Sequence, residues 1–225
     1  MLARLLPGQC HICRAWPAAP LCAQCLACFA RPQPRCPTCA APLAGGAPCG
    51  PCLLAPPPMS RTFAAVTYEW PWISLLTRFK FRQQTGLAAP LAALLLQAPG
   101  FAQAASEADA AVPVPASRQR LASRGYNPPL LLARALGAPC VLADALLRPK
   151  DAPPQRTFSR AQRLRSVRNA LVSNPARLAA LQGRHVLLID DVMTTGATLR
   201  AAAAALLQAG AAQVSAAVLA RTPPD

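Results

Sequence analysis

The chain has 225 residues, 53% of them hydrophobic but only 5% aromatic, and it carries 23 Lys+Arg against 8 Asp+Glu for a net charge of +15. This length allows one ordinary domain plus a small module, and the charge predicts attraction to phosphates. No segment offers the long uncharged apolar run of a membrane helix, and residues 1–10 lack the apolar core of a secretory signal. We therefore expect a cytoplasmic protein with no membrane span.

The first 55 residues are rich in cysteine, since nine of the ten cysteines lie before residue 53. Eight of them form four C-x-x-C pairs: Cys10/Cys13, Cys22/Cys25, Cys36/Cys39 and Cys49/Cys52. Each pair can present two thiolates from one tight turn, and two such turns close a tetrahedral four-sulfur site with Zn–S near ~2.3 Å. Because the segment is too short to build its own core, bound metal would supply its folding free energy. We predict a double zinc ribbon over residues 1–55 that holds two structural Zn²⁺ ions.

Several points about this module stay open in the sequence. Sequential pairing would place the first four of these cysteines on one ion and the last four on the other, but a crossed arrangement also fits the spacing. Disulfides would need an oxidising compartment, for which there is no signal, and redox-active dithiols are a further alternative. We expect Cys28 to be a small buried residue and His11 to be a bystander inside the first C-x-x-C turn.

After a Pro-rich linker over residues 56–60, the remaining chain, residues 61–225, reads as one domain. Its hydrophobic pattern predicts strands and helices in turn. We expect strands over Thr62–Tyr68 and Ala110–Pro115, helices over Ile73–Phe81, Leu87–Gln97 and Leu130–Leu136, and small polar connecting chain over Gly100–Ala108.

Basic residues then follow the second strand, first at Arg118, Arg120 and Arg124 and later over residues 148–168. Ligands of open α/β sheets bind beyond the carboxyl ends of the strands, where the first group falls. Guanidinium groups match phosphate oxygens bidentately, so one interpretation places these arginines on a ligand phosphate. The alternative is a solvated basic face. The stretch over 148–168 has the proline content and polarity of a mobile loop, and it is a candidate lid.

The most informative segment is residues 185–199. An apolar run over Val186–Ile189 predicts a buried strand that ends in Asp190 and Asp191, and a helix pattern covers Leu199–Gln208. The turn between them holds small and hydroxyl residues: Thr194, Thr195, Gly196, Ala197 and Thr198. A loop that feeds a helix N-terminus offers backbone N–H groups to a phosphate, and adjacent carboxylates can accept hydrogen bonds from sugar hydroxyls. The pattern therefore predicts a site for a ribose 5-phosphate.

The segment Leu188–Val192 with Thr194–Thr198 resembles the phosphoribosyl-pyrophosphate (PRPP) binding motif of type I phosphoribosyltransferases. The resemblance implies that Asp190 and Asp191 hold the ribose 2′- and 3′-hydroxyls and that the loop wraps the 5-phosphate. Lys80 together with Arg118, Arg120 and Arg124 would then attend the pyrophosphate, with Mg²⁺ bound to PRPP.

The whole layout is similar to the ComF/GntX family. The features that carry this resemblance are the cysteine module, Tyr68 with Arg78–Phe81, Val112–Pro115, Arg124–Asn127, the Gln155…Arg163 stretch and the motif described above. The resemblance implies a central parallel sheet with helices on both faces, preceded by a small double zinc-ribbon module, and a role in DNA uptake during natural competence. The chain departs from the family pattern at Arg82–Gln84, Pro128 and Ser166, which concern the acceptor side.

Three functions fit these features. The first is glycosyl transfer from PRPP to an acceptor that the sequence does not name, with no residue standing out as an acceptor base. The second is a competence factor that binds single-stranded nucleic acid, with DNA-uptake proteins as further partners. The third is a PRPP-sensing regulator without turnover. The sequence leaves the oligomeric state undetermined.

Overall fold

The computed structural model describes residues 8–148 and 171–223. Its strands are β1 (Thr62–Thr67), β2 (Ala110–Pro113), β3 (Leu146–Leu147), β4 (Val172–Ser173), β5 (His185–Met193) and β6 (Gln213–Arg221). Its helices are α1 (Ala23–Phe29), α2 (Gly50–Leu54), α3 (Trp72–Phe81), α4 (Ala88–Leu96), α5 (Phe101–Glu107), α6 (Arg118–Arg124), α7 (Pro128–Ala135), α9 (Leu178–Leu181) and α10 (Ala197–Gln208), with 3₁₀ turns η2 (Thr85–Leu87) and η3 (Pro175–Arg177).

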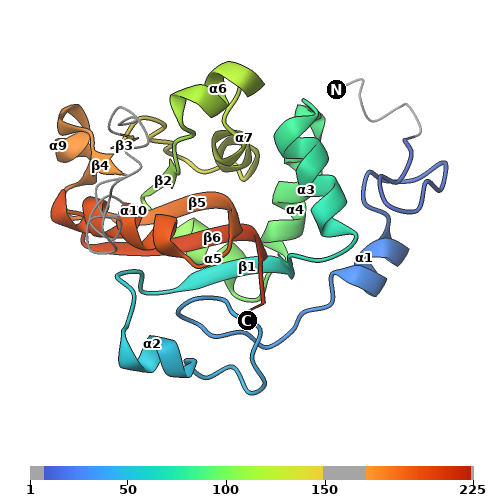
Figure 1. Ribbon diagram of the computed structural model, residues 1–225, viewed down its shortest axis with the longest axis horizontal. Helices are drawn as coiled ribbons and strands as arrows, with labels where there is room; N and C mark the ends of the chain where they lie inside the picture. The colour runs from blue at the N-terminus through green and yellow to red at the C-terminus, as the bar shows by residue number, and fades with distance from the viewer. Residues whose placement is uncertain (1–7, 149–170, 224–225) are drawn as a thin grey trace, which may run out of the picture.

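Within the described ranges, four parallel strands form the central sheet in the order β1-β6-β5-β2 (Figure 1). The two central strands are each nine residues long and run in register from His185 opposite Gln213 to Met193 opposite Arg221. Their side chains are buried along most of their length, as is typical of parallel strands that helices cover on both faces. β3 and β4 form a separate short antiparallel ribbon.

The side chains of β5 alternate between two apolar layers. Val186 and Leu188 join the layer that contains α10, whereas Leu187 and Ile189 join the layer that contains α3, α4 and α7. Successive residues of a strand point to opposite faces, so a single strand supplies both layers. The prediction of a central parallel sheet with helices on both faces is confirmed.

Helix α5 corrects one expectation, because the sequence predicts connecting chain over residues 100–108. Gly100 takes a left-handed conformation (φ 73°) at the helix start, and Phe101 and Ala104 are buried one turn apart. Burial of this short apolar face stabilises the helix, whose otherwise small and polar composition gives little helical signal in the sequence.

Two further boundaries differ from the sequence prediction. The strand that carries Asp190 and Asp191 continues to Met193 instead of ending at the carboxylates, because its partner β6 runs equally far. The basic residues after β2 form helix α6, which Ser117 caps by accepting a hydrogen bond from the backbone N–H of Arg120. Gly125, in a left-handed conformation, ends this helix.

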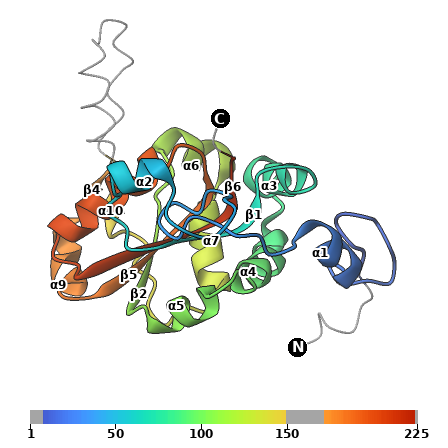
Figure 2. The same cartoon turned by 90° about the horizontal axis from the view of Figure 1, so that it is seen from below.

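The cysteine-rich segment divides into two parts that lie against different regions of the sheet domain (Figure 2). The part that contains α1 lies beside α3, where Trp72 Nε1 donates to the carbonyl of Phe29. The part that contains α2 joins the apolar core on the α10 side, because Cys36, Cys39 and Cys52 belong to the same buried cluster as the sheet residues. The expected domain boundary at residues 56–60 stays a prediction.

The candidate lid over residues 148–168 falls outside the described residues, apart from Arg148. No single helix among the described residues is long and apolar enough to cross a membrane. One pair of consecutive helical segments, Thr85–Leu96 and Phe101–Glu107, reaches that length and apolar composition only when the two are taken together, and it is bent by 103°.

Candidate functional site

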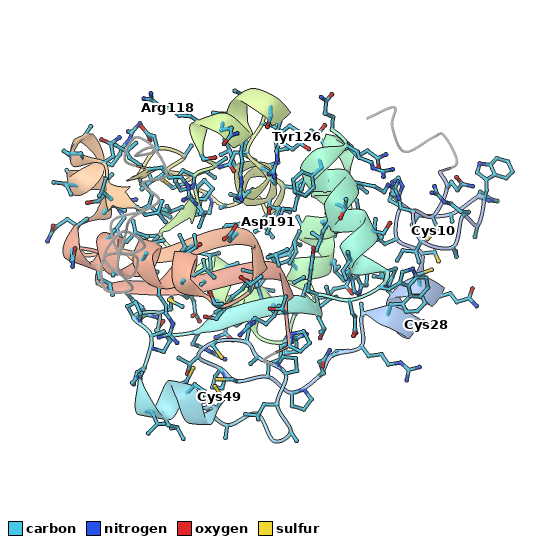
Figure 3. The ribbon with its side chains drawn as sticks, viewed as in Figure 1. Cys10, Cys28, Cys49, Arg118, Tyr126 and Asp191 are labelled. Atoms are coloured by element: carbon cyan, nitrogen blue, oxygen red, sulfur yellow. The ribbon has the colours of Figure 1, made fainter. Side chains whose placement is uncertain are left out.

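A cavity of about 310 Å³ opens at the carboxyl end of β5. It brings together residues that the sequence spreads over more than a hundred positions: Lys80, Arg120, Arg124, Asp190, Asp191, Thr194 and Thr198. Of the four basic residues expected at the pyrophosphate, Arg118 does not line the cavity, and in Figure 3 it lies away from Asp191. Tyr68, Asn127 and Arg148 also line the cavity, and the sequence prediction does not include them in the site.

A smaller hollow adjoins the cavity and is lined by the whole loop over residues 194–198 together with Asp190. Gly196 takes a left-handed conformation (φ 77°), and a Cβ there would come within 2.4 Å of the Met193 side chain. This glycine therefore lets the chain turn sharply from β5 into α10, so that the N-terminus of a twelve-residue helix faces the hollow. Free backbone N–H groups and the positive end of the helix dipole favour an anion at this position.

Arg221, at the end of β6, stabilises this loop, and the sequence prediction does not include it. Its side chain is 7% exposed, and its Nη1 donates to the carbonyls of Met193 and Thr194. Its Nε donates to the carbonyl of Cys39, in the second cysteine cluster. One buried guanidinium thus connects the loop to the second cysteine cluster. No pattern in the sequence indicates this connection, because its partners lie far apart along the chain.

The two carboxylates differ in their surroundings. Lys80 Nζ lies 2.9 Å from Asp191 Oδ1, and this pair is largely buried. Asp190 Oδ1 instead accepts from the backbone N–H of Asp191 at 2.8 Å. Burial and the neighbouring charge of Asp191 raise the pKa of Asp190 to about 7, although that N–H group, Lys80 and Arg148 act in the opposite direction. At neutral pH the pair therefore carries less than two full charges.

The basic wall of the cavity is fixed by aromatic contacts. The guanidinium of Arg124 lies 4.4 Å from the ring centroid of Phe81, a cation–π contact, and the Tyr126 hydroxyl donates to the carbonyl of Phe79. Asn127 Nδ2 donates to the carbonyl of Val114, which leaves its buried Oδ1 without a hydrogen-bond partner among the described residues. The contacts of Arg124 and Tyr126 join α3 to the end of α6 and the segment that follows it.

The eight cysteines of the C-x-x-C pairs form two clusters, which pair sequentially: Cys10, Cys13, Cys22 and Cys25 in one, and Cys36, Cys39, Cys49 and Cys52 in the other. In each cluster the four sulfurs lie within 4.8 Å of one another. Neighbouring sulfurs lie 3.8 Å (Cys10–Cys25), 3.7 Å (Cys13–Cys22) and 3.6 Å (Cys39–Cys49) apart. A tetrahedral metal with ~2.3 Å bonds to sulfur sets its ligands ~3.8 Å apart, whereas a disulfide needs ~2.05 Å. The arrangement fits a bound metal ion and disagrees with disulfides and with the crossed pairing.

The thiols within each cluster differ in pKa. Burial opposes ionisation of Cys10, but backbone N–H groups of the first cluster outweigh it and lower its pKa to about 6. Burial and contacts with the other thiols raise the pKa of Cys25. The second cluster repeats this division, with the pKa of Cys36 lowered and that of Cys52 raised. Four thiolates in one place need a cation to balance them, as a closed structural metal site provides.

One expectation about the first cluster is wrong. Cys28 is exposed and belongs to neither cluster, because it points from the solvent side of α1 while Cys25 points inward. His11, as expected, does not belong to the cluster, and its carbonyl and its Nδ1 instead contact the guanidinium of Arg78 on α3, at 3.2 and 3.0 Å.

Comparisons with known proteins agree with this architecture. The phosphoribosyl transferase domain family matches residues 122–225. The "DNA utilization protein YhgH" of Salmonella typhimurium is 34% identical over 96% of this chain and 98% of its own length, and that of Escherichia coli K12 is 33% identical over the same shares. The "Competence protein F" of Haemophilus influenzae is 33% identical over 77% of this chain and 78% of its own.

The relatives span both the cysteine clusters and the sheet domain, so the similarity covers the architecture as a whole. The chain therefore belongs to the ComF/GntX family, with a phosphoribosyltransferase-like α/β domain that follows two four-cysteine clusters.

Proposed function

We propose that the cavity at the carboxyl end of β5 binds PRPP or a closely related phosphoribosyl compound. The observation that carries this proposal is the placement of two carboxylates, a phosphate-type loop and four basic side chains around one cavity of about 310 Å³. The volume lies within the range of ~300–1,000 Å³ that small-ligand sites occupy. Sugar hydroxyls need acceptors and phosphates need donors, and the residues around the cavity supply both.

Asp190 and Asp191 would accept hydrogen bonds from the ribose hydroxyls, and the backbone N–H groups of residues 194–198 would hold the 5-phosphate. Lys80, Arg120 and Arg124 would neutralise the pyrophosphate. Since Lys80 is paired with Asp191 in the ligand-free protein, ligand binding would exchange that ion pair for bonds to the hydroxyl and the pyrophosphate.

Mg²⁺ would enter with PRPP and would supply positive charge that neutralises part of the charge on its pyrophosphate. The chain's own oxygens near that position, Asp190 and Asp191, are of the kind that this cation prefers. The basic side chains orient the pyrophosphate, and the hydroxyl contacts fix the ribose ring.

The two cysteine clusters would each hold one structural Zn²⁺. The sulfur spacings support this identity, because zinc accepts four thiolates in a closed tetrahedral site. A reducing, cytoplasmic location is part of the same proposal, since thiolates persist as ligands there.

The chemistry that such a site supports is transfer of the phosphoribosyl group. The bond from C1 to the pyrophosphate oxygen would break as an acceptor nucleophile bonds to C1, through an oxocarbenium-like transition state. The protein would contribute positioning and charge neutralisation. Because no side chain among the described residues that line the cavity stands out as a base for the acceptor, PRPP sensing without turnover is the second candidate.

A role in DNA uptake or use is part of the proposal, and the names of the relatives, "DNA utilization protein" and "Competence protein", support it. Single-stranded DNA and DNA-uptake proteins are its proposed partners. The net charge of +15 supports attraction to a nucleic-acid backbone.

Isothermal titration of the full chain with PRPP and Mg²⁺ tests the proposal, with mass analysis for released pyrophosphate across a set of bases and amines. We expect micromolar binding that Asp191→Asn weakens by about tenfold or more, because charge-assisted hydrogen bonds to the hydroxyl are lost. Asp144→Asn is the matched control, since Asp144 is an exposed carboxylate paired with Arg177 outside the cavity. Equal affinity in wild type and Asp191→Asn would reject the site.

A further inference from the structure

A second basic cavity, of about 390 Å³, lies between the first cysteine cluster and α3. Its lining includes His11 and Arg14 from the cysteine segment, Trp70 from the chain before α3, and Arg78 and Arg82 at the end of that helix. In Figure 3 the chain around Cys10 lies beside α3, on the side away from Asp191. No acidic side chain is among the residues that line this cavity.

Helix α3 separates this second cavity from the phosphoribosyl cavity. Ser74, Arg78 and Arg82 are spaced by four residues, so they follow one face of the helix, and all three line the second cavity. Lys80 lies between them in sequence, on the opposite face, and its side chain reaches Asp191. The two cavities share no lining residue, so a ligand in one does not occupy the other.

The arginines of the second cavity are arranged to receive an anion. Arg78 is held by three hydrogen bonds, from Nε to Gln84 Oε1 and from its two Nη atoms to His11. The guanidinium groups of Arg14 and Arg82 are exposed and have no acceptor or ion-pair partner in the described part of the chain. Burial and the nearby positive charges of Arg14 and Arg82 lower the pKa of Arg78, so both neighbours disfavour its charged form. A bound phosphate would offset these positive charges.

An aromatic surface stands beside these cations. Trp70 is 68% exposed, although large apolar side chains are usually covered, and its edge-to-face contact with Phe29, at 4.9 Å between centroids, fixes its orientation. Exposed indole rings beside basic side chains are the arrangement that stacks a base while its phosphate is neutralised.

From these observations we infer that the cavity between the first cysteine cluster and α3 binds a nucleotide unit, with its phosphate on Arg14, Arg78 and Arg82 and its base on Trp70. A free mononucleotide and one unit of a single DNA strand offer the same chemistry. The site is distinct from the phosphoribosyl cavity, and the inference does not depend on the function proposed for that cavity.

Fluorescence anisotropy of labelled single-stranded dT10, with dTMP and inorganic phosphate as competitors, tests this inference on the zinc-loaded full chain. We expect Arg14→Ala combined with Arg82→Ala to weaken dT10 binding about tenfold or more. The slope of log Kd against log salt should fall by about 1.4, since each phosphate contact to a single strand contributes roughly 0.7. Trp70→Ala should weaken binding by about fivefold or more, and Trp70→Phe should largely preserve it.

Arg134→Ala is the matched control, because Arg134 is an exposed arginine of α7 that lines neither cavity. Its affinity for dT10 should stay within about twofold of wild type, as should the PRPP affinity of the Arg14→Ala/Arg82→Ala protein. Measuring PRPP affinity in the Arg14→Ala/Arg82→Ala protein separates this inference from the proposed function. If dT10 binding depends on Arg14 and Arg82, the inference is supported even if PRPP does not bind anywhere.

Displacement of dT10 by dTMP would show that a free nucleotide is a sufficient ligand. Displacement only by longer strands would show that the ligand is a DNA strand. Both results support the site. Unchanged dT10 affinity in Arg14→Ala/Arg82→Ala, with zinc content and circular dichroism as in wild type, would overturn it. Competition by inorganic phosphate alone, with no effect of Trp70→Ala, would overturn the nucleotide assignment.

Discussion

At the scale of single residues, adjacent Asp190 and Asp191 create a charge that depends on pH. Burial and the charge of Asp191 raise the pKa of Asp190 to about 7, so its carboxyl is about half protonated at neutral pH in the ligand-free protein. Asp191 instead has Lys80 as its counter-ion. The two adjacent carboxylates therefore differ in their readiness to accept a hydrogen bond from a sugar hydroxyl, because Asp191 is ion-paired with Lys80 whereas Asp190 is partly protonated.

We expect the affinity for PRPP to rise by up to about tenfold between pH 6 and pH 8, because the ionised form of Asp190 is the stronger acceptor. Titration calorimetry at several pH values measures this. PRPP phosphates also ionise near this range, with pKa about 6. Asp190→Asn is therefore the reference, and the steeper rise in wild type is the contribution of Asp190. Parallel curves for the two proteins would contradict the assignment.

The same group affects stability in the opposite direction. A carboxyl whose pKa is raised on folding binds its proton more tightly in the folded state, so its contribution to the free energy of unfolding falls as pH rises from about 4 to about 7. Urea unfolding of ligand-free protein should show this fall, and Asp190→Asn should remove that part of the pH dependence. A wild-type contribution that instead grows with pH would mean that Asp190 is charged throughout.

Gly196 is a second residue with a specific prediction. Gly196→Ala places a Cβ on a left-handed backbone and within 2.4 Å of the Met193 side chain. We expect a loss of about 1–2 kcal/mol in the free energy of unfolding, together with weaker phosphate binding. Gly50→Ala is the control, since Gly50 has no such φ and a Cβ there would meet no atom within 4 Å. Equal stability of the two variants in urea unfolding would contradict the strain argument.

At the scale of elements, the end of β6 positions the loop between β5 and α10. Arg221 joins the carbonyls of Met193 and Thr194 to that of Cys39 and is almost fully buried. A buried cation that donates to several carbonyls is effective because each acceptor would otherwise lose its partner. The phosphate loop and the second cysteine cluster are therefore mechanically connected through one side chain.

Arg221→Ala should cost about 2–4 kcal/mol of stability, because several buried carbonyls lose their donor. Arg221→Lys should recover part of the stability but little of the PRPP affinity, since a single ammonium does not reproduce the planar fork. Urea unfolding and titration calorimetry measure the two quantities. Arg200→Ala is a control, because the Arg200 side chain, on α10, makes a single long hydrogen bond to described residues, 3.4 Å to the Ala55 carbonyl.

The elements also explain where the sequence prediction stopped. Helices α5 and α6 are short, and their composition, small and polar in one and basic in the other, carries little apolar periodicity. Their ends are instead set by glycines in left-handed conformation and by the Ser117 cap. By contrast, β1, α3 and β5 are predicted from their apolar sequence patterns, and these apolar side chains pack into the core.

At the scale of the whole molecule, the two cysteine clusters play unequal structural parts. Cys36, Cys39 and Cys52 lie inside the main apolar core beside the sheet, whereas the first cluster contacts the domain mainly through α1 and the Arg78–His11 bonds. A metal that folds the second cluster therefore also completes the sheet domain.

We expect two zinc ions per chain by elemental analysis, and one in either Cys13→Ser or Cys36→Ser. Cys36→Ser should lower the thermal midpoint substantially more than Cys13→Ser, because it disrupts a cluster within the core. Cys28→Ser is the control and should change neither value, since Cys28 is exposed and outside both clusters. Equal destabilisation by the two ligand variants would contradict the unequal roles.

The sequence alone determined the local chemistry of this protein. Four C-x-x-C turns, an apolar strand with two carboxylates and a small loop before a helix each lie within about fifteen consecutive residues, so the spacing of the chain itself presents their ligand atoms together. For the same reason the family could be identified from motifs, and the parallel sheet followed from that family.

Only the tertiary structure decided which distant groups meet. It placed Lys80 on Asp191, excluded Arg118 from the cavity, joined Arg221 to both Thr194 and Cys39, and set Arg14 beside Arg78 and Arg82. Such pairings depend on how helices pack on the two faces of a sheet, and packing is a property of the whole buried surface that no short stretch of sequence contains.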